Sequence, residues 1–193
     1  MEITTEIIRE LREMTGVSVM QCKKALEEAG GDLKQAEVIM KKRSAESAAK
    51  KAERALKAGT IGSYVHDGVI GSMVLLSSES DFVAKNPEFI ALARTIAMQV
   101  VATDPTYTTM ADIPEETRRA AIAVFEKEVE DKPKDMQEKI IEGKLASYFQ
   151  EQVLLEQPLI KDETKKVLDL INEATQKFGE RIEIGSFMRL SAR

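Results

Sequence analysis

The sequence predicts an α+β fold in two parts. Residues 1–56 are expected to form a three-helix module with a basic linker helix, and residues 57–193 a small antiparallel three-stranded sheet packed with helices on one side. Two observations support this prediction. Helix-capping signals recur along the chain, whereas β-rich runs are confined to residues 60–76 and 181–190. Near residue 57 the composition also changes from Ala/Lys-rich to β-branched, and the charge balance reverses.

Three short helices are predicted in about the first 43 residues, each opened by a capping residue. Thr4 can cap the first helix, and Gly16 ends it. Ser18 opens the second helix, and Asp32 opens the third after a pair of glycines. The apolar residues expected to face a common core are Ile7, Ile8, Leu11 and Met14 in the first helix and Val19, Cys22, Leu26 and Ala29 in the second.

On the second helix, Met20 points almost opposite to the apolar face because each residue advances by about 100°. It lies between Lys23 and Lys24. An apolar side chain beside two ammonium groups and away from the core suggests a contact site. The alternative is an ordinary exposed methionine that covers the lysine stems.

A basic, alanine-rich stretch follows in residues 41–57, with seven basic side chains against two glutamates. We expect it to continue as helix until Gly59 ends it. Charge runs of this kind usually mark a solvated connector, and a binding role is the alternative. Residues 1–58 carry 12 basic and 10 acidic side chains, and the rest of the chain carries 16 and 23. Because most of the chain is acidic, nucleic acid is a poor primary partner.

Residues 60–66 and 69–76 are β-rich runs separated by the dipeptide Asp67-Gly68. This dipeptide favours a type I′ turn, in which both central residues have positive φ. The two runs therefore predict a β-hairpin, and the C-terminal β-rich run predicts a third strand.

The connector at residues 80–86 joins the hairpin to a helix that Asn86 can cap and Pro87 can begin. It carries Asp81 and Phe82 side by side, and because both of its ends are fixed we expect it to present them to something outside. The alternative is that Phe82 folds into the core and Asp81 only caps a turn. The helix that follows should bury Ile90, Ala93, Ile96, Ala97 and Val100.

In the second half of the chain, residues 112–115 predict a capping box for a helix that reaches about residue 130. Pro133 ends or restarts this helix. Asp162 is expected to cap a later helix that ends at Phe178. The residues expected to point inward on the first of these helices are Ala121, Val124, Phe125 and Val129.

The sequence offers little for catalysis or for a bound cofactor. Cys22 and His66 are the only cysteine and histidine, too few for a zinc or redox centre, and no Walker-type phosphate loop occurs. Glu79 and Asp81 are two residues apart, so an extended backbone would point both carboxylates the same way and make an acid–base pair conceivable. No apolar run approaches the ~20 residues that span a bilayer, and the first residues are neither a signal nor a transit sequence. We therefore expect a cytosolic protein.

Several short stretches, taken together, resemble the bacterial elongation factor Ts family in its short, single-core form. The most specific is Ser80-Asp81-Phe82-Val83, which is similar to a Thr-Asp-Phe-Val run of that family. The resemblance implies an N-terminal ubiquitin-associated-like module. It also implies a guanine nucleotide exchange factor for elongation factor Tu that is not an enzyme and uses no cofactor. The other similar stretches are residues 15–16, 22–26, 31–32, 142–145 and 154–158.

The resemblance also implies which residues contact elongation factor Tu. Asp81 and Phe82 are implied to enter the GTPase near its nucleotide site and to displace the elements that hold Mg²⁺. Loss of Mg²⁺ coordination removes attraction between the nucleotide and the protein, so GDP is released. The implied contact residues are Ser80, Asp81, Phe82 and Val83 at the Mg²⁺ site and Met20, Lys23, Ile70 and Gln99 elsewhere on the same partner.

Four positions depart from the family pattern: Ser77, Ser78 and Ser80, where the family commonly has Asn, Cys and Thr, and Gln99. Ser80 replaces a threonine and keeps the capping hydroxyl. Gln99 stands where the family often has a histidine, and an amide can still donate a hydrogen bond. Short members of the family pair as homodimers, which implies a dimer formed through the sheet domain. The resemblance implies no direct contact with nucleic acid or membrane.

Two rival functions remain open from the residues. One is an adaptor whose three-helix module binds a ubiquitin-like or other helical partner while the sheet domain only dimerises. The other is an acid–base enzyme, which requires a buried carboxylate pair with a raised pKa in a cleft. Exposure of the Phe82 ring in the free protein is the observation that best separates an outward-facing contact residue from a core residue.

Overall fold

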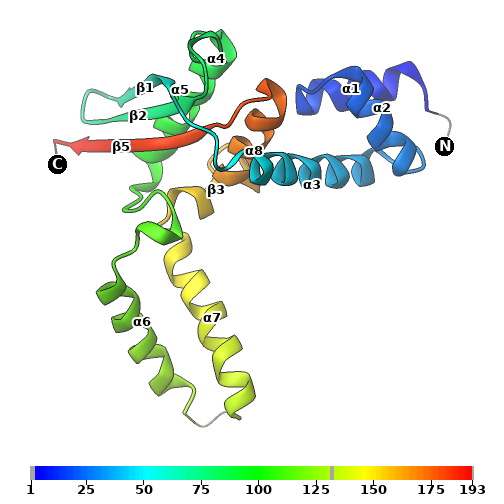
Figure 1. The fold of residues 1–193 in the computed structure, drawn as a ribbon. Helices are drawn as coiled ribbons and strands as arrows, with labels where there is room; N and C mark the ends of the chain where they lie inside the picture. Colours follow the sequence, from blue (N-terminus) through cyan, green and yellow to red (C-terminus); the bar gives the residue numbers. More distant parts are fainter. Residues whose placement is uncertain (1–2, 131–132, 193) are drawn as a thin grey trace.

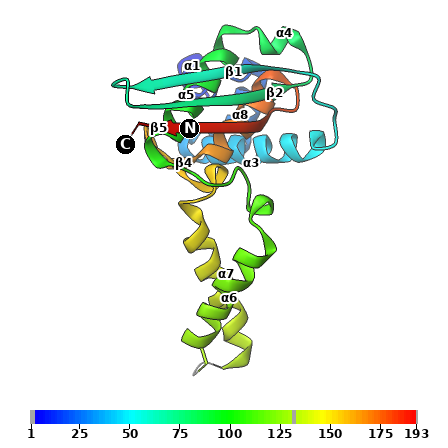
Figure 2. The same cartoon turned by 90° about the vertical axis from the view of Figure 1, so that its left-hand side faces the viewer.

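The computed structural model describes residues 3–130 and 133–192 and has the predicted α+β architecture. A helical N-terminal segment leads into a three-stranded antiparallel sheet with helices on its inner face, and two further helices extend away from the sheet (Figure 1, Figure 2). The N-terminal helices are α1 (Thr5–Thr15), α2 (Val19–Glu28) and α3 (Leu33–Lys51).

All three predicted N-terminal caps are confirmed. The side chains of Thr4, Ser18 and Asp32 each accept a hydrogen bond from a backbone N–H in the first turn of the helix that follows. Gly16 ends α1 with a φ of 66°, a left-handed conformation that favours glycine. The helices share a core that consists of Leu11, Val17, Cys22, Ala25, Leu26, Ala29, Ala36 and Met40.

The expected core of the N-terminal segment is wrong at two positions. Met14 is 47% exposed and Val19 is 51% exposed. Val19 is the first residue of α2, and the inward positions around this turn are filled by Val17 and Cys22, which are buried. Periodicity alone does not separate the outer residues of a first turn from its inner ones.

The end of α3 also differs from the prediction. The helix runs through the start of the basic stretch and ends at Lys51, whereas Gly59 lies in a strand. A Cβ on Gly59 would lie only 2.7 Å from the carbonyl oxygen of Leu76. This glycine therefore permits the close approach of two strands and does not end a helix.

The sheet consists of β1 (Ala58–His66), β2 (Ile70–Ser78) and β5 (Glu183–Ser191), paired antiparallel in that order. The predicted hairpin is confirmed, because Asp67 and Gly68 have φ values of 51° and 70°. Across this turn the N–H of Val69 donates to the carbonyl of His66 at 3.0 Å. The predicted third strand is confirmed as well.

Two helices follow the hairpin, the short α4 (Asp81–Ala84) and the long α5 (Pro87–Thr103). Asn86 caps α5 as predicted, with its side-chain oxygen 2.8 Å from the backbone nitrogen of Glu88. α5 crosses the inner face of the sheet so closely that a Cβ on Gly62 would lie 2.2 Å from the backbone of Ala93. The close approach fixes the position of the α4–α5 corner relative to the sheet.

The prediction for the buried residues of α5 is wrong at Ile90 and missed Phe89, Gln99 and Val101. Phe89 is fully buried, whereas Ile90, which was expected in the core, is 44% exposed. The Phe89 ring packs edge to face on Phe178, with 5.8 Å between the ring centroids. The larger aromatic side chain thus takes the inward position at the start of the helix. The other residues predicted to be buried are so: Ala93, Ile96, Ala97 and Val100.

A 3₁₀ turn, η1 (Met110–Asp112), leads into α6 (Glu115–Glu128) and α7 (Lys134–Gln150). The two helices lie side by side and extend away from the sheet, a placement that the sequence did not predict (Figure 1, Figure 2). α6 therefore packs mainly against one other helix, which explains why Val124 is 56% exposed although it was expected to face inward. Of the other three residues, Ala121 and Val129 are buried and Phe125 is partly buried.

The capping box predicted at residues 112–115 is wrong. The carboxylate of Asp112 accepts hydrogen bonds from the backbone N–H and the hydroxyl of Thr109, at 2.7 and 2.9 Å. Asp112 thus closes η1, and Pro114 precedes α6 without a side-chain cap. Proline before the first turn still suits a helix start, because its φ is already restricted.

The chain returns to the sheet through η2 (Leu154–Glu156), β3 (Pro158–Leu159), β4 (Asp162–Lys166) and α8 (Val167–Phe178). The helix predicted from Asp162 therefore begins later. Asp162 starts β4, where its carboxylate accepts hydrogen bonds from the N–H and hydroxyl of Thr164 at 3.1 and 2.6 Å. α8 ends at Phe178 as predicted, before Gly179 with a φ of 73°.

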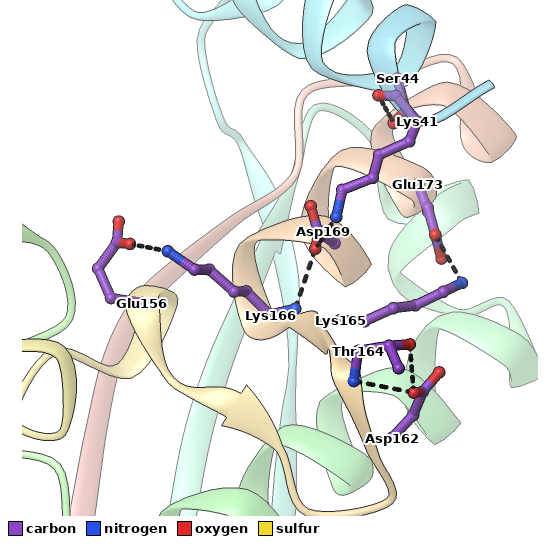
Figure 3. A network of polar contacts seen from close by, with 9 residues as sticks. All are labelled: Lys41, Ser44, Glu156, Asp162, Thr164, Lys165, Lys166, Asp169 and Glu173. Atoms are coloured by element: carbon purple, nitrogen blue, oxygen red, sulfur yellow. Dashed lines mark hydrogen bonds and ion pairs between the residues drawn. The ribbon is translucent and has the colours of Figure 1, made fainter. Parts of the chain in front are cut away.

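Helix α3 packs along α8, and one of the polar contacts drawn in Figure 3 joins the two helices. The ammonium of Lys41 lies 2.7 Å from the carboxylate of Asp169, which also accepts the backbone N–H of Lys166 at 2.9 Å. Nearby, Lys165 pairs with Glu173 at 2.8 Å. Burial acts to lower the pKa of Lys165, but the hydrogen bond to Glu173 and its charge outweigh burial and raise this pKa. The Lys41–Asp169 ion pair thus joins α3 to α8, whereas the Lys165–Glu173 pair joins β4 to α8.

Candidate partner-binding site

Helix α4 forms a raised corner between β2 and α5. Ser80 is extended, with φ −127° and ψ 154°, and its hydroxyl oxygen accepts the N–H of Val83 at 3.4 Å, so it begins the helix. Lys85 ends this single turn, and Asn86 caps α5 directly after it. Figure 1 and Figure 2 place α4 at the end of the molecule opposite α6 and α7. A short turn fixed by structure on both sides is a rigid platform for its outward side chains.

Phe82 has the most exposed large apolar side chain in the described part of the chain, at 81%. Val83 and Ala84 fill the inner side of α4 and are buried. Because they occupy the inward directions of this single turn, the ring of Phe82 points outward. The exposure expected for Phe82 is confirmed, and the alternative in which the ring belongs to the core is wrong.

Asp81 stands beside this ring with its side chain 75% exposed. Its carboxylate lies 2.7 Å from the ammonium of Lys85, one turn along the chain. The hydrogen bond from Lys85 and its positive charge hold the pKa of Asp81 below the ordinary value of 3.8. The corner therefore presents a negative charge next to an aromatic ring at neutral pH.

The acid–base hypothesis for Glu79 and Asp81 is wrong, because it requires a raised pKa. The backbone N–H of Arg181, at 2.6 Å, and the guanidinium of Arg54 together outweigh partial burial and lower the pKa of Glu79. Both carboxylates therefore hold their protons less tightly than usual, which does not suit a general acid near neutral pH. In residues 3–130 and 133–192, no cluster of His, Cys, Asp or Glu is arranged to hold a metal ion, and no helix has the length and apolarity of a membrane span.

The sequence did not predict the residues that hold α4 in place. Glu180, in the connection between α8 and β5, accepts hydrogen bonds from the backbone N–H and the hydroxyl of Ser80, at 2.9 and 2.5 Å. The partners are 100 residues apart in the chain, so no local pattern could have paired them. The guanidinium of Arg181 donates to the carbonyl of Arg54 at 2.7 Å and joins the segment after α3 to the same region.

Three of the other predicted contact residues are at least partly accessible. Met20 is 69% exposed on α2, and the side chain of Lys23 is 59% exposed, with its ammonium 3.8 Å from Glu27. Ile70 is half-buried at the start of β2, paired with His66 on one side and Ser191 on the other. These residues lie on elements other than α4, so any common partner must span several elements.

The remaining two predicted contact residues, Val83 and Gln99, are buried, at 4% and 1% exposure. The Gln99 amide nitrogen donates to the carbonyl of Pro158 at 3.0 Å, and its oxygen accepts the N–H of Ile160 at 2.9 Å. Gln99 thus joins α5 to the segment around β3, and its polar atoms are used inside the chain. The expectation that this side chain reaches a partner does not agree with its position.

The outer face of the sheet is apolar. Leu75 lies opposite Ile61, and Met73 lies opposite Met188, across neighbouring strands. The apolar run at the end of β2 was a signal for this, because strands with one solvated face usually alternate apolar and polar residues. An exposed apolar face of this kind is typical of an interaction surface. Its residues are Ile61, Val65, Met73, Leu75, Met188 and Leu190.

Comparison with known proteins places these features in one family. A family model described as Elongation factor TS matches residues 4–192. A protein of Thermotoga petrophila named Elongation factor Ts is 47% identical over 190 residues, covering 98% of this chain and 96% of the relative. Proteins with the same name from Thermodesulfovibrio yellowstonii and Coprothermobacter proteolyticus are 46% and 40% identical, each over 98% of this chain and 96% and 98% of the relative.

Proposed function

The chain belongs to the elongation factor Ts family and so has a role in translation elongation, and from this premise we propose that it is a guanine nucleotide exchange factor for elongation factor Tu. In this proposal it works in the cytosol, carries out no covalent chemistry and needs no cofactor. The observation that supports it most is the exposed ring of Phe82 beside the ionised Asp81 on a fixed corner.

We propose that Asp81 and Phe82 enter elongation factor Tu near its bound GDP and displace the elements that hold Mg²⁺. Burial of one phenylalanine side chain is worth about 2 kcal/mol, a large part of which is available to Phe82 because its ring is 81% exposed in the free protein. The carboxylate of Asp81 adds a negative charge that competes with the diphosphate for positive groups. Loss of Mg²⁺ leaves the diphosphate charge less neutralised, so GDP dissociates faster.

Linkage makes this proposal reciprocal. If the exchange factor weakens GDP binding by some factor, then GDP with Mg²⁺ must weaken binding of the exchange factor by the same factor. In this proposal the protein binds elongation factor Tu in both its GDP-bound and its nucleotide-free form, binds the nucleotide-free form more tightly, and is released more readily once a new nucleotide binds. No chemical step on this chain is required for the cycle.

The remaining contacts in the proposal come from Met20 and Lys23 on α2 and from Ile70 at the hairpin. We include Ser80 as the cap of α4, and Val83 as the residue that fills its inner side. The N-terminal segment, residues 1–56, acts in this proposal as a ubiquitin-associated-like module that adds affinity.

Release of fluorescently labelled GDP from elongation factor Tu tests the exchange function. Excess unlabelled GDP is added with increasing amounts of the protein, and the dissociation rate is followed by stopped flow. The proposal predicts a rate that rises with protein concentration and then saturates. An unchanged dissociation rate at saturating protein would reject it.

We also propose that the protein forms a homodimer through the outer face of the sheet. This face carries six exposed aliphatic side chains from three strands, and a second copy offers an identical apolar surface. A twofold axis brings the same patch of each subunit together, which suits a self-complementary surface. Sedimentation equilibrium at micromolar concentration tests the proposal. It predicts a particle of twice the mass of one chain, which is 21.5 kDa, and a particle with the mass of one chain would contradict it.

A further inference from the structure

The orientation of Phe82 depends on one turn of helix, because α4 has only four residues. Isolated helices of this length do not hold themselves together in water, since the cost of nucleation is not recovered by so few hydrogen bonds. Something outside α4 must therefore order it. Packing of the buried Val83 and Ala84 provides one support, and the contacts of Ser80 at the N-terminus of α4 provide another.

The carboxylate of Glu180 makes the strongest hydrogen bonds to Ser80. Its two carboxylate oxygens accept separate donors from Ser80: the backbone N–H at 2.9 Å and the hydroxyl at 2.5 Å. Hydrogen bonds to an ionised acceptor are about twice as strong as neutral ones. With its hydroxyl proton directed to Glu180, the same oxygen of Ser80 is left to accept the N–H of Val83 at 3.4 Å. The glutamate thus holds the residue that caps α4.

We propose that Glu180 is a positioning residue for nucleotide exchange, which acts through Ser80 to keep Phe82 in the orientation that its partner recognises. This inference rests on the proposed exchange function for its kinetic consequence. Its structural part, that Glu180 orders α4 in the free protein, stands apart from that function. Glu180 itself contacts no nucleotide in this scheme.

The kinetic effect follows from population arithmetic. When only a fraction of the free molecules has α4 in the competent arrangement, the apparent dissociation constant rises by the inverse of that fraction. The bound state selects the competent arrangement, so the exchange rate at saturation stays the same. For Glu180→Ala we expect a half-saturating concentration about ten-fold higher and a saturated GDP release rate within about two-fold of the original.

Glu180→Gln is the conservative variant. Its amide oxygen can still accept the backbone N–H of Ser80, and the serine hydroxyl can turn to accept from the amide nitrogen. We expect it to recover most of the loss, with a half-saturating concentration raised only about three-fold. Glu163→Ala, at an exposed glutamate on β4, removes the same charge away from α4 and serves as the matched control.

The direct test of positioning uses fluorescence in the free protein. The chain contains no tryptophan, so Phe82→Trp introduces a single reporter at the site. We expect the anisotropy of this tryptophan to fall when Glu180→Ala is added and to stay unchanged when Glu163→Ala is added, at a temperature below the thermal transition of every variant. Unchanged anisotropy with Glu180→Ala would overturn the proposal, whatever the exchange assay gives.

The exchange assay separates the remaining outcomes. A fall in anisotropy together with a higher half-saturating concentration and an unchanged saturated rate supports positioning. A lower melting temperature with no change in anisotropy or half-saturation means that Glu180 is only structural, and overturns the proposal. If the unsubstituted protein does not accelerate GDP release, the proposed exchange function is wrong. If Glu180→Ala lowers the anisotropy but leaves the half-saturating concentration unchanged, Glu180 orders α4 but does not act as a positioning residue for exchange.

Discussion

Replacing Phe82 with alanine separates a side chain that serves a partner from one that serves the fold. The ring is 81% exposed, so its removal deletes few contacts within the chain. We expect the free energy of unfolding to change by less than about 0.5 kcal/mol, as for surface substitutions in general. The proposed complex loses the burial of the ring, about 2 kcal/mol, which corresponds to a decrease of about 30-fold in the second-order rate constant for GDP release.

Phe89→Ala is a matched control, because it makes the same substitution at a ring with 0% exposure on the next helix. Its ring packs on Phe178 in the core, so we expect a loss of about 3–5 kcal/mol in the free energy of unfolding. Urea unfolding followed by circular dichroism measures stability, and labelled-GDP release measures exchange. A stability loss in Phe82→Ala as large as in Phe89→Ala, or an undiminished exchange rate in Phe82→Ala, would refute the reasoning.

Three further predictions concern a buried amide, a carboxylate beside α4 and the outer face of the sheet. Gln99→Ala should lower the free energy of unfolding by about 2 kcal/mol, because it removes the hydrogen bonds that this buried side chain makes with the carbonyl of Pro158 and the N–H of Ile160, and urea unfolding checks this. Because the pKa of Glu79 is lowered in the folded protein, its ionised form adds stability above the ordinary pKa of 4.5, and this stability is lost as the pH falls through the folded-state pKa. Glu79→Gln should therefore make the melting temperature depend less on pH in this acidic range, which thermal unfolding at a series of pH values checks. Met73→Glu puts a charge on the outer sheet face and should convert the proposed dimer into a monomer by sedimentation, whereas Val38→Glu, at an exposed valine on α3, should not.

The turns and helix caps that depend only on neighbouring residues were predicted correctly in most cases. The type I′ turn at Asp67-Gly68 and the caps at Thr4 and Asn86 depend on residues within one turn of the chain, and all are present. The prediction for Asp162 was wrong although it used the same rule. A side-chain oxygen can close a turn within a strand as well as cap a helix, and only the tertiary structure decides between them.

Hydrogen bonds between residues far apart in the chain could not be predicted from the sequence. The hydrogen bonds between Ser80 and Glu180 join residues 100 apart, and Gln99 reaches residues near position 158. The projection of α6 and α7 from the sheet was likewise not predicted (Figure 1). The division of the chain between residues 56 and 57 stays a prediction, although the ion pair of Lys41 with Asp169 joins α3 to α8.

The candidate contact residues also differ in whether local or distant parts of the chain determine their exposure. The exposure of Phe82 could be expected from a connector fixed at both ends, and it is observed. The burial of Gln99 could not, because a polar residue on an apolar helix is read as a surface contact unless its partners on the segment around β3 are known.

The effect of Mg²⁺ on the acceleration of GDP release is the most direct test of the proposal that Asp81 and Phe82 displace the metal. The rate of labelled-GDP dissociation from elongation factor Tu is measured at saturating protein, once with Mg²⁺ and once after chelation by EDTA. If Asp81 and Phe82 act by displacing the metal, the protein should accelerate release strongly with Mg²⁺ and far less when the metal is already gone. The same fold acceleration under both conditions would contradict this account.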